Sequence, residues 1–83
     1  MQSVQTLIGM NIKVARVRKS WSQVDLASKL NVEQSYISRI EKGSVAASCV
    51  RIYEIIHFLG CEHTDIFPDI ADVESKFNQN NHS

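Results

Sequence analysis

The sequence has little of what builds sheets, long loops or membrane spans. Its 83 residues include one proline and three glycines, and no segment alternates between apolar and polar residues as a half-buried strand does. No apolar run approaches the ~20 residues that a membrane-spanning helix needs. These absences argue against a β-rich fold and a membrane protein, and they favour one small all-α domain.

Cysteine is also scarce, and catalytic patterns are missing. Cys49 and Cys61 do not have the spacing of a redox or zinc motif, and no signal peptide precedes them. We therefore expect reduced, partly buried thiols in a cytoplasmic protein. Cys61 and His63 would need two further ligands to hold a metal ion. No nucleophile has a base in a recognisable arrangement, so we expect neither an enzyme nor a cofactor.

The chain has no net charge, whereas domains that bind nucleic acid by charge alone are usually basic. The charges are unevenly placed, however. Residues 1–60 hold eight basic and four acidic side chains, a net charge of +4, and residues 61–83 hold one basic and five acidic, a net charge of −4. The first part can therefore present a positive face to an anionic partner.

What the sequence does contain is helical periodicity with clear helix ends. Ser22, supported by Asp25, and Ser48 are typical N-caps, and Gly43 and Gly60 are typical residues just after a helix. The fourth helix has an apolar stripe of Cys49, Ile52, Ile55, Ile56 and Leu59. We expect helices over 4–19, 23–30, 34–42, 49–59 and 62–67, with a short additional helix over 68–77.

Residues 22–43 carry the strongest motif. Ala27 is small enough for a second helix to cross closely, Asn31 tolerates the left-handed conformation, and Val32 is apolar within the turn. The spaced set is Leu26, Ala27, Leu30, Asn31, Val32, Ile37 and Ile40. It resembles the helix-turn-helix of the Cro and phage-repressor family of DNA-binding proteins, and the resemblance extends from Ile8 to about Phe67. The other interpretation is an ordinary hairpin of two helices in a bundle.

The resemblance implies a five-helix, repressor-like DNA-binding domain over residues 1–67. An amphipathic helix over 68–77 and a disordered polar tail over 78–83 would follow it. Arg16 and Glu41 match positions that carry an ion pair in this family. The pair joins the first helix to the second helix of the motif, which is the recognition helix and here covers 34–42. Trp21 matches the apolar position before the second helix, and we interpret it as a core anchor.

In such a motif the second helix enters the major groove, which is about 12 Å wide. Gln34 can make two hydrogen bonds to adenine and Arg39 two to guanine, and Ser35 and Ser38 complete the expected base-reading set. Glu33 is expected to cap the helix, with acceptance of a hydrogen bond from cytosine as the alternative. The expected phosphate contacts are Gln23, Tyr36, Lys42, Ser44, Lys19 and Lys29.

We therefore expect a sequence-specific regulator of transcription that binds double-stranded DNA, with RNA polymerase as a further partner. Its size and the sequence Tyr36-Ile37-Ser38 are similar to those of restriction-modification controller proteins, with phage repressors and antitoxins as alternatives. The other function class is an antitoxin-like or adaptor module that binds protein. The near-neutral charge and the apolar loop at 45–47 favour that class, whereas Gln34, Ser35 and Arg39 oppose it.

A single helix-turn-helix reads only a few base pairs, so specificity in a genome requires a second copy. We expect a homodimer on a two-fold symmetric operator, formed by the fourth and fifth helices and the C-terminal segment. The expected interface is Val50, Tyr53, Ile66, Phe67, Ile70, Val73 and Phe77. In the alternative, residues 68–77 fold back on their own domain against Val14 and Val17.

Overall fold

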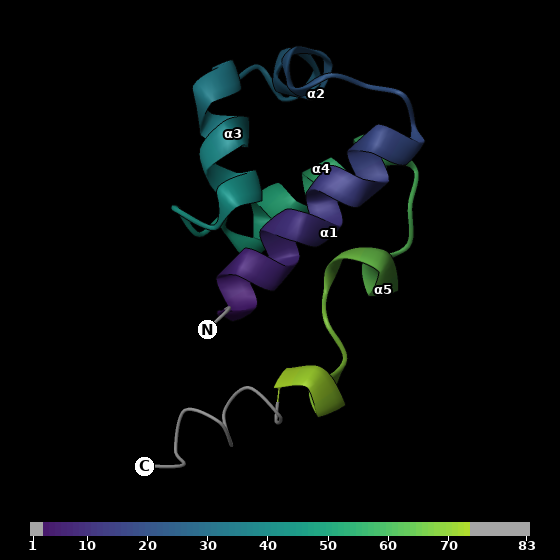
Figure 1. The fold of residues 1–83 in the computed structure, drawn as a ribbon. Helices are drawn as coiled ribbons and strands as arrows, with labels where there is room; N and C mark the ends of the chain where they lie inside the picture. Colours follow the sequence, from purple (N-terminus) through teal and green to yellow (C-terminus); the bar gives the residue numbers. More distant parts are fainter. Residues whose placement is uncertain (1–2, 74–83) are drawn as a thin grey trace.

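The computed structural model describes residues 3–73, which form five α-helices and no strand (Figure 1). The expected all-α fold is confirmed, and every helix begins and ends within one residue of its expected bounds. A further helical turn covers residues 70–73. Residues 74–77 of the expected C-terminal helix and the tail at 78–83 lie outside the described residues. The helices are α1 Val4–Arg18, α2 Gln23–Leu30, α3 Gln34–Lys42, α4 Cys49–Leu59 and α5 His63–Ile66.

Local hydrogen bonds fix the ends of α2 and α3. Ser22 Oγ accepts from the Asp25 backbone N–H, and the Asp25 carboxylate accepts from the Ser22 backbone N–H, which completes the capping box. The bond from the Ser22 backbone lowers the pKa of Asp25 below its usual value, so the carboxylate remains an acceptor at neutral pH. Asn31 and Gly43 end the two helices in the left-handed conformation, with φ of 57° and 78°.

The expected cap at Glu33 is not formed. Glu33 has the extended backbone of an N-cap residue, but its side chain accepts no hydrogen bond from the start of α3. The side chain is exposed, and glutamate is longer than the residues that cap best. The start of α3 is therefore free of the side-chain bond that closes the start of α2.

One apolar core joins all five helices. α1 contacts α3, α4 and α5, and α2 contacts α3 and α4. Cys49 was expected in the core stripe of α4, but it is exposed at the first position of that helix, on the same surface as Val50 and Tyr53. The buried apolar residues are Ile12, Leu26, Ala27, Leu30, Ile37, Ile40, Ile52, Ile55, Leu59 and Ile66.

Ile66 lies in that core and not on the dimer surface where we expected it. Its side chain is 0% exposed, and its carbonyl oxygen accepts a hydrogen bond from Asn11 Nδ2 at 2.8 Å. α5 has a single turn, and α1 holds that turn so that Ile66 points inward. Ile66 is therefore unavailable to a partner.

α1 and α3 approach each other closely at Gly9. Gly9 is buried, and a Cβ atom there would collide with the backbone carbonyl oxygens of Ile40 and Glu41. We did not predict this contact from the sequence. The available signal was a glycine within a helix, which is about 1 kcal/mol less favourable there than alanine. Arg16 lies two turns further along the same face of α1, so the close approach also brings Arg16 to α3.

Candidate nucleic-acid interface

The expected base-reading side chains share one face of α3. Gln34, Ser35 and Arg39 are exposed and Ser38 is half-buried. With 3.6 residues per turn, these four positions fall together on the side opposite the buried isoleucines. α3 therefore turns a polar face to solvent while its apolar face packs in the core.

Gln34 is held in place by Gln23, the first residue of α2. Gln34 Nε2 donates a hydrogen bond to Gln23 Oε1, and Gln23 Nε2 donates to Glu41 Oε1 at 3.0 Å. After these bonds Gln34 keeps one N–H donor and its carbonyl oxygen. Those two groups match the N7 acceptor and N6–H₂ donor that adenine presents in the major groove.

The expected ion pair between Arg16 and Glu41 is present beneath these amides. Arg16 Nε lies 2.7 Å from Glu41 Oε2 and Nη2 lies 3.0 Å from Oε1, while Nη1 donates to the Trp21 carbonyl oxygen at 2.7 Å. The two residues are 7% and 6% exposed. The hydrogen bond with Glu41 raises the pKa of Arg16 above its usual value, so the arginine is fully charged.

The ion pair and the two glutamines form one continuous network from α1 to the start of α3. Every buried side-chain nitrogen and oxygen among residues 3–73 has a hydrogen-bond partner. Buried polar groups that are fully satisfied hold a single arrangement of the helices. The buried ion pair and its bond to Gln23 therefore hold α1, α2 and α3 together, and the exposed amide of Gln34 bonds to the outer end of this network.

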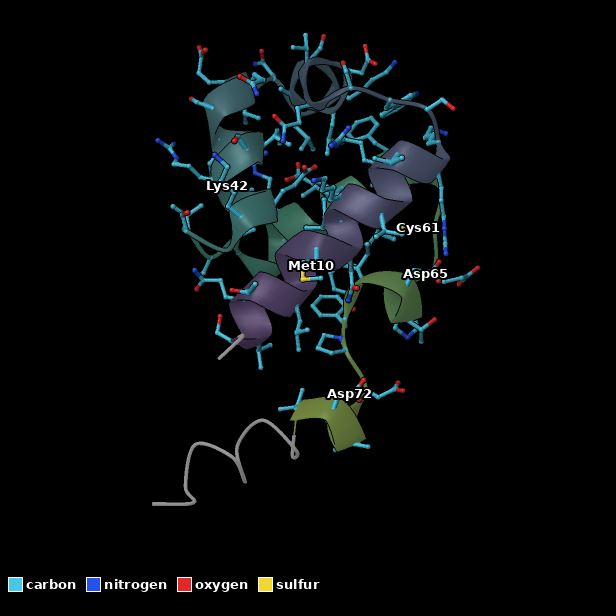
Figure 2. All side chains as sticks on the ribbon, in the orientation of Figure 1. Met10, Lys42, Cys61, Asp65 and Asp72 are labelled. Atoms are coloured by element: carbon cyan, nitrogen blue, oxygen red, sulfur yellow. The ribbon has the colours of Figure 1, made fainter. Side chains whose placement is uncertain are left out.

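Lys19 and Lys29, two of the expected phosphate contacts, both lie near the Trp21 ring. Lys19 Nζ lies 4.9 Å and Lys29 Nζ 5.9 Å from the centroid of that ring. Trp21 is half-buried and packs against the core, in agreement with its expected role as an anchor. Lys42 and Ser44 are exposed at the other end of the motif, on α3 and in the loop after it. Figure 2 shows Lys42 on α3.

Arg51 is a basic residue near the motif that we did not predict as a contact. Its Cζ lies 5.8 Å from the centroid of the Tyr36 ring on α3, and its Nη1 lies 3.3 Å from Glu54 Oε1. Arg51 and Tyr36 are separated by a loop and belong to different helices. No periodicity in the sequence relates them, so charge alone was the available signal.

The remaining expected dimer residues differ in exposure. Val50 and Ile70 are each 72% exposed and Tyr53 is 53% exposed. Phe67 and Val73 are half-buried, and the Phe67 ring packs against Tyr53 with centroids 5.7 Å apart. Phe77 lies outside the described residues.

Residues 68–73 do not cover Val14 and Val17 on α1, where the alternative interpretation placed the C-terminal segment. Val14 is 47% and Val17 is 56% exposed. Figure 2 shows Asp72, at the far end of this segment, on the side of the molecule away from α2. The described part of this segment therefore lies beside Leu7 and Asn11 of α1, away from α2.

The structure shows no metal-binding cluster in the described part of the chain. Within residues 3–73, no three His, Cys, Asp or Glu side chains are grouped so that they could hold a metal ion. Burial, with a smaller contribution from the charge of Asp65, raises the pKa of the Cys61 thiol, which disfavours the reactive thiolate. None of the helices in this range is long and apolar enough to cross a membrane.

Comparison with known proteins assigns the same region to one family. A family model described as helix-turn-helix matches residues 12–66. Over 63 residues the chain is 25% identical to y4dJ, an uncharacterized HTH-type transcriptional regulator of Sinorhizobium fredii, and the match covers 76% of this chain and 82% of that protein.

Two solved structures have a similar fold. The restriction-modification controller protein C.AhdI of Aeromonas hydrophila superimposes with a TM-score of 0.70 and 27% identity, over 76% of this chain and 96% of that one. The clp gene regulator ClgR of C. glutamicum gives a TM-score of 0.75 and 23% identity, over 78% and 83% of the two chains.

Proposed function

This chain belongs to the helix-turn-helix family, and from that premise we propose that it is a sequence-specific transcriptional regulator that binds double-stranded DNA as a homodimer. The observation that carries the proposal is the hydrogen-bonded pair Gln23–Gln34. It supports a recognition helix whose leading amide is oriented before DNA arrives. Preorganised polar groups lose less entropy on binding than mobile ones.

In this proposal α3 lies in the major groove. The free N–H and carbonyl of Gln34 pair with adenine, and the guanidinium of Arg39 pairs with O6 and N7 of guanine. Ser35 and Ser38 are short enough to let the helix approach the base edges. Gln23 and the first backbone N–H groups of α2 contact a phosphate beside the groove, which sets the register of the helix.

Removing the base-reading side chains tests this directly. Gln34→Ala and Arg39→Ala should each weaken binding to the preferred duplex by about 1–3 kcal/mol and relax the preference at particular base pairs. Lys42→Ala is the control, because loss of a phosphate contact weakens all sequences alike and lowers the salt dependence. Titrations of preferred and scrambled duplexes measure both effects. If Gln34→Ala binds the two duplexes in the wild-type ratio, Gln34 does not read a base.

The homodimer is proposed to form through the exposed apolar surface of α4. Val50 and Tyr53 are its most exposed apolar residues, and the Tyr53 ring is continuous with Phe67. Apolar side chains gathered on one face favour association, because contact removes them from water. In a two-fold dimer the recognition helices would lie roughly 34 Å apart, one turn of DNA.

Sedimentation of two matched variants tests this interface. Tyr53→Asp should raise the dimer dissociation constant at least ~10-fold, since it places a charge in the contact. Val17→Asp is the control, because Val17 is similarly exposed but lies on α1. A wild-type protein that is monomeric at tens of micromolar would contradict the proposal. So would equal dimerisation of the wild type and both variants.

Control of restriction-modification genes is the specific role that the comparisons favour. Nearly the whole of C.AhdI aligns with this chain, at an identity above that of the other solved structure described. On that likeness we propose a cytoplasmic controller of such genes, with RNA polymerase as the partner at the promoter.

A further inference from the structure

Arg51 lies on α4, outside the helix-turn-helix motif, and is held beside the recognition helix α3 by Tyr36 of that helix and by Glu54. Its guanidinium lies over the Tyr36 ring and its Nη1 contacts Glu54 on the next turn of α4. The Arg51 side chain is 29% exposed, so its charge remains accessible to solvent on one side. The function proposed above makes no use of this group.

The position of Tyr36 shows on which side of α3 this charge lies. With about 100° between successive residues, the polar face of α3 has Gln34 near one edge and Tyr36 beyond the other. Gln34 bonds to Gln23 of α2, whereas Tyr36 contacts Arg51 of α4. Gln23 of α2 and Arg51 of α4 therefore lie at opposite edges of the polar face of α3.

A helix in the major groove runs between two sugar–phosphate backbones. Contacts to both backbones hold it in register more firmly than contacts to one. Gln23 and the start of α2 lie on one flank. Since Arg51 lies on the other flank, we propose that Arg51 contacts a phosphate of the backbone on the α4 side, with Tyr36 orienting its guanidinium. This inference rests on the proposed DNA-binding function.

The chemistry of the three side chains permits this contact without rearranging the helices. A planar guanidinium can stack on a ring through its face while it donates hydrogen bonds from its edge. The bond to Glu54 lies at the surface, where the Glu54 side chain is 48% exposed, and such pairs are weak and screened by salt. A phosphate oxygen, which makes strong charge-assisted hydrogen bonds with arginine, can therefore replace the carboxylate.

Salt dependence of DNA binding tests the proposal. Arg51→Gln should reduce the slope of log K against log salt by about 0.9 for each bound protomer. At 100 mM salt it should weaken binding about 5–10-fold per protomer for preferred and scrambled duplexes alike. Arg18→Gln is the matched control, because Arg18 is exposed on α1 beside the hollow between α1 and α5. It should leave both quantities close to the wild-type values.

Three further variants separate charge, stacking and competition. Arg51→Lys should keep the slope but recover only part of the affinity, since an ammonium lacks the planar fork. Glu54→Gln should tighten binding about twofold or more, because phosphate no longer displaces a carboxylate. In a Tyr36→Leu background, Arg51→Gln should have a smaller effect than in the wild type, because the guanidinium has lost its orienting ring. Sedimentation of each variant confirms that the oligomeric state is unchanged.

Two results overturn the inference while leaving the proposed function intact. In the first, the wild type prefers one duplex, but Arg51→Gln keeps the salt slope and the affinity of the wild type, as Arg18→Gln does. In the second, Arg51→Gln changes the base preference and leaves the slope unaltered, which would make Arg51 a base-reading residue. A wild type that shows no preference among duplexes would instead contradict the proposed function.

Discussion

Glu41→Gln is expected to lower the free energy of unfolding by about 3–5 kcal/mol, because it leaves the Arg16 guanidinium buried without a counter-charge. Glu41 is 6% exposed and accepts from Arg16 through both oxygens. Its Oε1 also accepts from Gln23. An amide has a single acceptor oxygen, so its NH₂ group would face a donor, and one bond of the network would be lost. Urea unfolding followed by circular dichroism measures the change.

Two further variants establish that the effect comes from the stranded charge. Arg18→Met on the same helix should change stability by no more than about 0.5 kcal/mol, because Arg18 is exposed. The double variant Arg16→Met with Glu41→Leu should recover most of the loss, since replacing both partners of a buried pair by apolar residues is often neutral. If Glu41→Gln unfolds at the wild-type urea concentration, the pair does not stabilise the fold.

Gly9→Ala is expected to destabilise the protein by at least about 3 kcal/mol, at the upper end of overpacked substitutions. The added Cβ meets two backbone carbonyl oxygens of α3, which cannot rotate away as a side chain can. The helices would have to separate, which also pulls Arg16 away from Glu41. In a helix position with open space around it, the same change would raise the free energy of unfolding by about 0.5–1 kcal/mol. The sign of the measured change therefore distinguishes the two situations.

Gly60→Ala is the comparison variant for Gly9. No atom lies within 4 Å of a Cβ at Gly60, but its φ is +66°, so the expected cost is about 1–2 kcal/mol from the backbone conformation alone. Thermal and urea unfolding of the two variants should rank Gly9→Ala as the less stable. A Gly9→Ala protein as stable as the wild type would show that α1 and α3 do not approach as closely as described.

The helices could be predicted because their ends are decided locally. The capping box of Ser22 and Asp25 and the left-handed Asn31 and Gly43 act within a few residues of each helix end. Arg16 and Glu41 are 25 residues apart in sequence. Their ion pair was expected only from the resemblance to a known family.

Features that depend on packing between distant segments could not be predicted from the sequence. α5 has four residues, too few for periodicity to show which side faces the core, so Ile66 was wrongly placed at the surface. Cys49 stands at the end of a helix, where an apolar stripe does not determine burial. The backbone contact at Gly9 and the stacking of Arg51 on Tyr36 depend on how α1, α3 and α4 cross, which no local pattern specifies.

Selection of bound sites from a pool of random duplex DNA tests the central proposal most directly. We predict enrichment of a two-fold symmetric site whose half-sites lie about one helical turn apart. Each half-site should contain an adenine read by Gln34 and a guanine read by Arg39, and their preference should disappear with Gln34→Ala and Arg39→Ala respectively. A pool that shows no enrichment after repeated rounds, at a protein concentration where the dimer is present, would contradict sequence-specific DNA binding by this chain.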